Sequence, residues 1–162
     1  MRIAPAIAMS LMIAGTAAAH PAETPTKSIT SKAVPAPARP AASVVDGFHL
    51  ALARGDTRAA LRFLAENALI FESGGAERSK AEYASHHLAA DAAFSQAVPA
   101  RITRRTGEAM GSTAWIASEG RTTGKWKGKA VDVVTTETMI LRRMGGAWKI
   151  THIHWSSSPG DQ

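Results

Sequence analysis

From residue 101 onward the sequence contains four segments of strand-like composition, and this pattern constrains the fold more than any other. The expected strands span residues 101–110, 113–123, 130–143 and 148–156. Gly111, Gly124 and the pair Gly145–Gly146 supply the turn residues between them. Because short connections join antiparallel neighbours, the pattern predicts an antiparallel meander at the end of the domain.

Three helices and one strand are expected before the meander. Apolar residues recur at helical spacing from Ala42 until Gly55 ends the run, and Asp56 can cap a second, short helix. Ser79 and Glu82 form a capping-box pattern that opens a third helix. The expected helices span 42–54, 57–66 and 79–97, with a strand at 68–73. This order predicts an α+β fold in which three N-terminal helices pack on one face of a curved, mainly antiparallel sheet.

Residues 1–19 have the pattern of a signal peptide. Arg2 gives a positive start, residues 3–14 are apolar, and residues 17–19 are three alanines that suit a cleavage site. We expect cleavage after Ala19, an expectation that the N-terminal residue of the exported chain tests. The apolar run is shorter than the roughly 20 residues that span a bilayer. The sequence therefore predicts an exported, soluble protein without membrane insertion, periplasmic if the source is Gram-negative.

Residues 20–41 have the composition of a linker. This stretch is rich in proline and almost free of large apolar side chains, so it can bury too little surface to offset the entropy of ordering. We expect a disordered, proline-rich linker here and a single domain over residues 42–158.

Composition limits the kinds of site that the domain can hold. The chain has no cysteine, which excludes disulfides, thiolate metal sites and a cysteine nucleophile. Four of its basic residues precede residue 42, so the domain itself is nearly neutral. The lysines of the segment GRTTGKWKGK lack the spacing of a phosphate-binding loop and are interpreted as a hairpin tip. We expect no nucleic-acid partner, since no recognition module is present.

The order of elements over residues 42–158 resembles the nuclear-transport-factor-2-like superfamily, in its SnoaL-like branch of small exported bacterial proteins. The segments ALIFESGGAERSKAEYASHHL and TETMILRRMGGAWKITHIHWSS carry the resemblance. It implies a cone-shaped half-barrel, often dimeric, whose concave sheet and helices enclose a pocket. Ketosteroid isomerase, scytalone dehydratase, limonene epoxide hydrolase and polyketide cyclases share that fold, and so do proteins that only bind or dimerise. The resemblance therefore does not fix the function.

The last expected strand holds two histidines one residue apart. A regular strand alternates its side chains between two faces. The expected pocket face carries Trp148, Ile150, His152 and His154. The expected outer face carries Lys149, Thr151, Ile153 and Trp155. Because the outer face would expose a large apolar patch, we expect a homodimer that pairs through it.

Further pocket candidates lie on other elements. Along the third helix His86 and His87 point in different directions, so only one of them is expected in the pocket. Glu72 ends a strand where a cone opens, and Glu137 is a carboxylate among apolar neighbours that needs a partner. His49 has no supporting pattern and is expected at the surface. The expected pocket residues are Glu72, Tyr83, His86, His87, Glu137, Ile150, His152 and His154.

Three functions are consistent with these residues. The first is small-ligand binding, in which His152 and His154, with His86 or His87 and Glu72, could hold zinc or copper. The second is a cofactorless lyase, isomerase or hydrolase with a pocket histidine as general base, although the catalytic patterns of ketosteroid isomerase and epoxide hydrolase do not map onto this sequence. The third is a dimerising interaction module. We take ligand binding as the main hypothesis.

Overall fold

The computed structural model describes residues 34–160. The expected signal peptide and most of the expected linker lie outside these residues. The described elements are η1 (Ala36–Ala38), α1 (Arg39–Ala53), α2 (Thr57–Phe63), β1 (Leu64–Glu72), β2 (Gly75–Glu77), α3 (Lys80–His86), α4 (Leu88–Ala97), β3 (Ala100–Met110), β4 (Thr113–Trp126), β5 (Lys129–Met144) and β6 (Ala147–Pro159). The four expected meander strands are all present, and β4, β5 and β6 run longer than expected.

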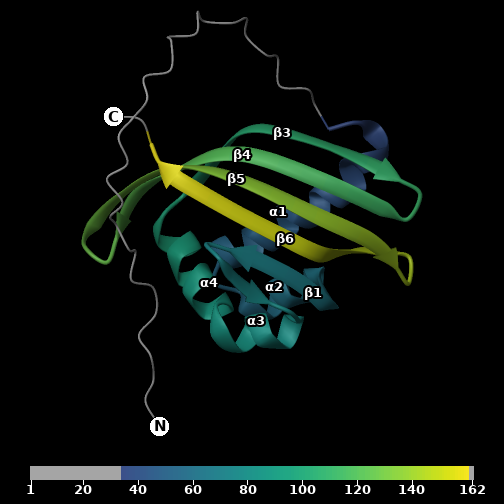
Figure 1. Ribbon diagram of the computed structural model, residues 1–162, viewed down its shortest axis with the longest axis horizontal. Helices are drawn as coiled ribbons and strands as arrows, with labels where there is room; N and C mark the ends of the chain where they lie inside the picture. The colour runs from purple at the N-terminus through teal and green to yellow at the C-terminus, as the bar shows by residue number, and fades with distance from the viewer. Residues whose placement is uncertain (1–33, 161–162) are drawn as a thin grey trace, which may run out of the picture.

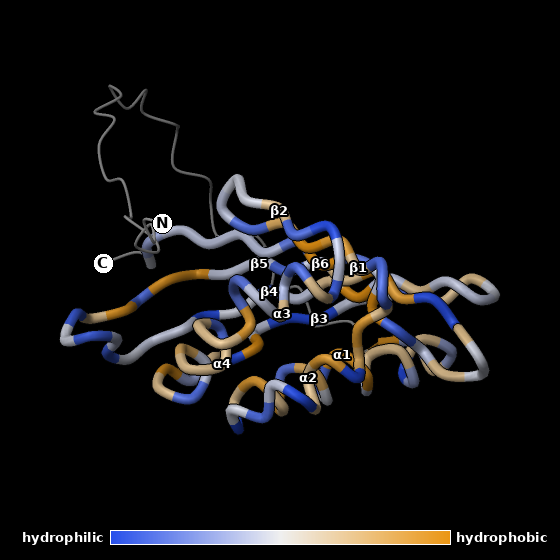
Figure 2. The backbone as a smooth tube through the Cα atoms, turned by 90° about the horizontal axis from the view of Figure 1, so that it is seen from below, coloured by the Kyte–Doolittle hydropathy of each residue, from blue (hydrophilic) through white to orange (hydrophobic). Residues whose placement is uncertain are grey.

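The strands form one six-stranded sheet in the order β2-β1-β6-β5-β4-β3. Only the pairing of β1 with β6 is parallel. The long strands β3 to β6 lie side by side and curve, with α1 behind them (Figure 1). Figure 2 shows α1, α2 and α4 together on one side of the sheet. The expected α+β half-barrel with helices on a curved, mainly antiparallel sheet is confirmed.

Two features of the helical part differ from expectation. The expected third helix is divided into α3 and α4, with His87 between them in a distorted helical conformation (φ −108°, ψ −29°). Nδ1 of His87 contacts the buried carboxylate of Glu77 on β2. The short edge strand β2, which pairs with β1, was not expected from the sequence.

The domain also begins earlier than expected. Helix α1 starts at Arg39, and its second residue, Pro40, occupies the first turn, where the absence of a backbone N–H costs nothing. Ala38 and Ala41 are fully buried in the core. The expectation of a disordered linker up to residue 41 is therefore wrong for residues 36–41. The small alanine side chains pack closely against the rest of the domain. The low content of large apolar residues in this stretch did not predict that burial.

The core lies between the helices and the concave face of the sheet. Val45 and Phe48 on α1 meet Ile116 on β4 and the β5 residues Met139 and Leu141, all of them fully buried. Apolar burial of this kind is the main source of stability in a domain of this size. No helix in residues 34–160 is long and apolar enough to cross a membrane.

A β-bulge at Thr151 changes which residues of β6 face inward. On β5, Leu141 pairs with Ile150, but its neighbour Ile140 pairs with His152. Thr151 is therefore an extra residue without a partner of its own, and an extra residue reverses the alternation that follows it.

The reversal overturns the expected facing of the last strand. Ile153 is fully buried, and Trp155 lies on the inner face with it. His152 and His154 instead lie on the outer face beside Phe71 of β1, with ring centroids 5.3 and 6.4 Å from that of Phe71. The parity argument assumed a regular strand, and a single inserted residue invalidates it.

The substitutions Ile153→Ala and His154→Ala test which of these two residues faces the core. Ile153→Ala opens a cavity in the core and should lower the free energy of unfolding by about 2–5 kcal/mol. His154→Ala alters an exposed side chain and should change it by less than about 0.5 kcal/mol. Urea denaturation of both variants measures the difference. A larger loss for His154→Ala than for Ile153→Ala would contradict the bulge.

Candidate functional site

A cavity of about 490 Å³ opens between the concave face of the sheet and the helices α1 and α4. Apolar side chains provide much of its wall, among them Leu52, Phe94, Trp126, Val133 and Trp155. Its charged and ionisable lining groups are Glu72, Asp91, Glu119, Glu137, Arg101 and His49. A hollow of similar volume between η1 and β3 has Glu108 as its one ionisable lining residue. The candidate site is therefore the first cavity.

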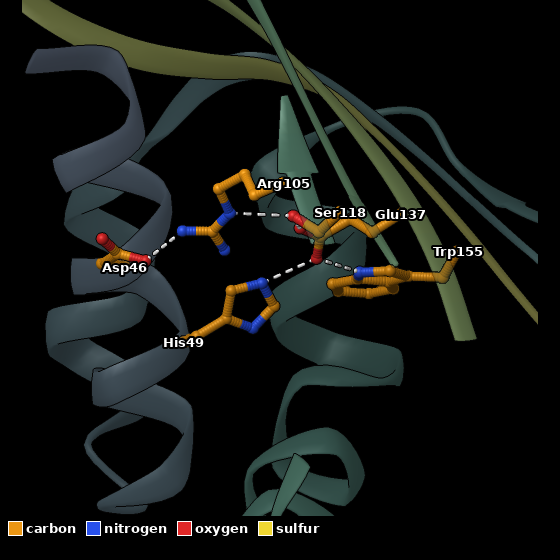
Figure 3. Close-up of polar contacts among 6 residues, drawn as sticks. All are labelled: Asp46, His49, Arg105, Ser118, Glu137 and Trp155. Atoms are coloured by element: carbon orange, nitrogen blue, oxygen red, sulfur yellow. Dashed lines mark hydrogen bonds and ion pairs between the residues drawn. The ribbon is translucent and has the colours of Figure 1, made fainter. Parts of the chain in front are cut away.

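Glu137 is the centre of the first polar cluster in this cavity. Its side chain is only 9 % exposed. Oε2 accepts a hydrogen bond from Trp155 Nε1 at 2.8 Å and lies 2.6 Å from Nε2 of His49, while Oε1 accepts from Ser118 Oγ at 3.3 Å (Figure 3). Both carboxylate oxygens are thus satisfied, as a buried carboxylate requires.

Arg105 connects this cluster back to helix α1. Its Nε donates to Ser118 Oγ at 3.0 Å, and its Nη1 forms an ion pair with Asp46. Asp46 and His49 are three residues apart on α1, so they lie on neighbouring positions of one helix face (Figure 3). The cluster therefore attaches α1 to the sheet at two points, through Asp46 and through His49.

The environment keeps Glu137 ionised. Burial would raise its pKa, but the hydrogen bonds from His49 and Trp155 and the charges of His49 and Arg105 outweigh burial and hold the pKa below the usual value of 4.5. An ionised carboxylate only accepts hydrogen bonds, so Nε2 of His49 carries the hydrogen of this bond in both the charged and the neutral imidazole.

In its neutral form, His49 has a lone pair on Nδ1. Within residues 34–160 no protein group is hydrogen-bonded to this atom, and the side chain is 39 % exposed and lines the cavity. A carboxylate that fixes the tautomer of an imidazole leaves the other nitrogen available as an acceptor of protons. The expectation that His49 lies at the surface without a role is therefore wrong. No local pattern could reveal its partner, because Glu137 is 88 residues away in sequence.

A second polar group lies where β1 ends against α4. Glu72 and Asp91 both line the cavity, and Tyr83 donates a hydrogen bond to Asp91 Oδ2 at 2.8 Å. Burial, followed by the charge of Asp91, raises the pKa of Glu72. Burial also raises the pKa of Asp91, opposed by the hydrogen bond from Tyr83, and it raises the pKa of Tyr83 well above its usual value. Two carboxyl groups of the cavity, Glu72 and Asp91, therefore have raised pKa values, and a third, Glu137, has a lowered one.

The structure brings together only part of the expected site. Glu72 and Glu137 line the cavity. Tyr83 and His87 stand behind it, where they contact Asp91 and Glu77. Ile150 is a core residue, and His86 is exposed. His49, Asp91, Ser118, Arg105 and Trp155 are members of the two polar groups that the sequence patterns did not reveal.

The expected zinc or copper site is not formed. His152 Nδ1 donates a hydrogen bond to the backbone oxygen of Leu69, 2.9 Å away, on the outer face, and His154 is exposed. Neither approaches Glu72 or the α3–α4 histidines on the inner side. In the described part of the chain no group of three or more histidine, aspartate or glutamate side chains is placed to hold a metal ion. The bulge at Thr151 is the physical reason, since it turns both strand histidines outward.

Comparisons with known proteins agree with this geometry. A family model described as a SnoaL-like domain matches residues 41–159. A candidate ketosteroid isomerase from Shewanella frigidimarina is 39 % identical, with a TM-score of 0.68, over 70 % of this chain and 92 % of that chain. No match is found among curated proteins.

Two further solved structures share the fold at lower identity. A candidate calcium/calmodulin-dependent protein kinase II association domain from Xanthomonas campestris is 23 % identical, with a TM-score of 0.64, over 84 % of this chain and all of that chain. A candidate dehydratase of the NTF2-like family from Streptomyces avermitilis is 15 % identical, with a TM-score of 0.64, over 75 % of this chain and 96 % of that chain. At these identities the likeness concerns the fold alone.

The lowered pKa of Glu137 predicts a pH dependence of stability. A group whose pKa is lower in the folded than in the unfolded state stabilises the fold above its unfolded value, here 4.5, and loses that contribution as pH falls towards the folded value. Glu137→Gln should remove this contribution and lower the free energy of unfolding at neutral pH by roughly 1–3 kcal/mol. Denaturation curves of both proteins at several pH values measure the difference, which should shrink below pH 4.5.

Asp132→Asn is the matched control. Its carboxylate is exposed and paired with Arg121, whose hydrogen bond lowers the pKa of Asp132. An exposed pair contributes little to stability, so this variant should follow the wild-type profile closely. A constant difference between wild type and Glu137→Gln at all pH values would show that Glu137 is not ionised in the folded protein.

Proposed function

The chain belongs to the SnoaL-like domain family, and on that premise we propose that its cavity binds a small, largely apolar organic molecule on which His49 transfers a proton. The observation that carries the proposal is the 2.6 Å contact between His49 Nε2 and the buried carboxylate of Glu137 in the cavity wall. Metal chemistry through the strand histidines is not part of the proposal, because those residues lie on the other face of the sheet.

The binding part of the proposal rests on the size and lining of the cavity. Its volume of about 490 Å³ falls within the range of about 300–1,000 Å³ that small-molecule sites occupy. Leu52, Phe94 and Val133 offer apolar contacts, and the indole of Trp155 is held by Glu137 and stacked on Phe48 with ring centroids 6.3 Å apart. A rigid aromatic wall of this kind favours a ligand with a flat or ring-shaped apolar body.

The catalytic part rests on the two polar groups that share the cavity. His49 offers an available lone pair on Nδ1, with Glu137 fixing the tautomer. Glu72 and Asp91, whose pKa values are raised, can keep a proton and donate a hydrogen bond. A neutral imidazole and a protonated carboxyl group in one cavity suit the base and the acid of one reaction. The reaction class we propose is isomerisation, in which a proton leaves one carbon next to a carbonyl and returns to another.

The likeness to the Shewanella frigidimarina protein supports an isomerase over other cofactorless reactions. That protein is 39 % identical and is named as a candidate ketosteroid isomerase. The name describes that protein and not this chain, and on that basis we choose a steroid as the first substrate to test. Export, which we expect from residues 1–19, belongs to the same proposal and makes the site one that acts outside the cytoplasm.

We also propose that two copies pair through the outer face of the sheet. Phe71, Val134 and Ile140 lie there on β1 and β5 with 39, 40 and 37 % of their surfaces exposed. His152 and His154 flank Phe71 on the same face. Apolar side chains gathered on one sheet face favour burial against a second copy.

A steroid with a 3-oxo group and a 5,6 double bond tests the catalytic proposal. We expect wild type to convert it to the conjugated isomer, which ultraviolet absorbance follows. His49→Gln removes the base and should lower kcat by about 10²–10⁴-fold. Glu137→Gln should lower kcat as well, because the imidazole loses its fixed tautomer. The control His154→Gln replaces a histidine on the outer face and should leave kcat unchanged.

Equal activity of His49→Gln and wild type would overturn the assignment of His49 as base. If wild type does not turn over the steroid, fluorescence titration with the neutral probe N-phenyl-1-naphthylamine measures binding alone. Val133→Trp, which fills the cavity, should abolish that binding. Binding that survives in Val133→Trp, or no binding in wild type, would overturn the cavity as a ligand site.

Light scattering tests the proposed pairing. Wild type should have the mass of two chains at tens of micromolar, and Ile140→Lys should have the mass of one chain, because a buried lysine without a partner opposes association. The control Ala89→Lys adds the same charge at an exposed position on α4, on the other side of the sheet. A wild type with the mass of one chain would contradict the pairing.

A further inference from the structure

The hairpin between β4 and β5 borders the cavity through Trp126, and this end of the cavity is called its mouth below. It projects at the end of the sheet where α4 lies (Figure 1). Trp126 lines the cavity, and its ring lies edge to face with that of Phe94 on α4, with centroids 5.6 Å apart. The turn residues Lys127 and Gly128 both have positive φ, at 48° and 80°, as a tight two-residue hairpin turn requires. The hairpin tip is thus held over α4 by one aromatic contact.

Three lysines surround this aromatic residue. Lys125, Lys127 and Lys129 belong to the hairpin, and Nζ of Lys127 lies 5.4 Å from the centroid of the Trp126 ring. Lys129 pairs directly with Trp126 across the two strands. In residues 34–160 none of the three lysines forms an ion pair or a hydrogen bond to a side chain. None of the three lines the cavity itself, so they leave three positive charges beside its mouth without a protein counter-ion.

The acidic residue closest in sequence to the three lysines, Asp132, is already paired with an arginine. Asp132 receives both Nε and Nη2 of Arg121 at 2.7 Å, and a bidentate pair of this kind satisfies the carboxylate. Arg101 of β3 also lines the cavity. The mouth of the cavity therefore carries an excess of positive charge.

The ionised carboxylate of Glu137 lies further from the hairpin tip on the same face of the sheet. On the inner face of β4 and β5 the paired residues run from Trp126–Lys129 at the tip, through Gly124–Val131 and Thr122–Val133, to Ser118–Glu137 in the interior. Lys129 and Glu137 are eight residues apart on β5, a separation of roughly 26 Å along an extended strand. Glu72 and Asp91 add further carboxyl groups to the cavity wall. Along this ladder the residues change from the cationic Lys129 beside the mouth, through valine, glycine and threonine, to the acidic Glu137.

This arrangement selects the orientation and the charge of a ligand. An anionic group placed beside the ionised Glu137 would be repelled, whereas the same group at the hairpin would meet three lysines. A cation would be favoured in the interior only after it had passed those lysines. The apolar middle needs no charge on the ligand at all.

We infer that the ligand is an amphiphile whose apolar body lies in the cavity and whose anionic group, a carboxylate, sulfate or phosphate, is held at the mouth by Lys125, Lys127 and Lys129. The inference rests on the proposed function, since it requires that the cavity binds a small molecule. It adds the chemical class of that molecule and assigns the hairpin as the part that recognises its charge.

Two fluorescent probes with the same rings test the inference. 8-Anilinonaphthalene-1-sulfonate carries an anionic group, and N-phenyl-1-naphthylamine lacks it. In the full chain the triple variant Lys125→Gln, Lys127→Gln, Lys129→Gln should bind the sulfonate about fivefold or more weakly at low ionic strength. It should bind the neutral probe within about twofold of wild type. The loss for the sulfonate should shrink as salt is added.

A control triple variant removes the same charge elsewhere. Arg58, Arg62 and Arg142 are exposed and none lines the cavity. Their joint replacement by glutamine should leave both affinities at the wild-type value. An equal loss of sulfonate binding in both triple variants would show an effect of net charge and overturn the inference.

Displacement of the bound sulfonate identifies the head group. Dodecanoate and dodecyl phosphate should displace it from wild type better than dodecanol does, and their order distinguishes a carboxylate from a phosphate. Dodecanol that displaces it equally well would overturn the inference, as would unchanged sulfonate affinity in the lysine variant. Failure of both probes to bind wild type would instead overturn the proposed function, and this inference with it.

Discussion

The arrangement of the site depends on the need to satisfy one buried carboxylate. Glu137 lies on the inner face of β5 with 9 % of its side chain exposed, and it needs donors from its surroundings. Ser118 from β4, Trp155 from β6 and His49 from α1 supply them. Three elements are thereby fixed relative to β5 by one residue. The same bonds that make the buried charge tolerable also orient the imidazole and hold the indole as a wall of the cavity.

The bulge at Thr151 makes this arrangement possible. On a regular strand that keeps Ile150 inside, Trp155 would point outward and could not reach Glu137. With the bulge, Ile150, Ile153 and Trp155 all face inward, and the strand histidines move to the outer surface. One inserted residue therefore decides between a histidine pair in the pocket and an indole in the pocket.

Much of the fold could be predicted from local pattern, and much of the site could not. Turn glycines and the capping box at Ser79 correctly gave the meander and the start of α3, because these signals act within a few residues. Glu137 was expected to need a partner, yet its partner His49 lies 88 residues away and no local pattern connects the two. A bulge has no reliable sequence signal, since many residues can occupy it. The alanines of residues 38–41 were misjudged because burial depends on closeness of packing as well as on side-chain size.

The double attachment of α1 bears on how the cavity exchanges its contents with solvent. Asp46 and His49 are one helical turn apart and are held by different strands, through Arg105 on β3 and Glu137 on β5. A slide or rotation of α1 would break both contacts at once, which makes the helix a stationary wall. The hairpin tip, in contrast, contains Gly124 and Gly128, and its aromatic contact with α4 is that of Trp126 with Phe94. We therefore expect the hairpin, rather than α1, to move when a molecule enters or leaves the cavity.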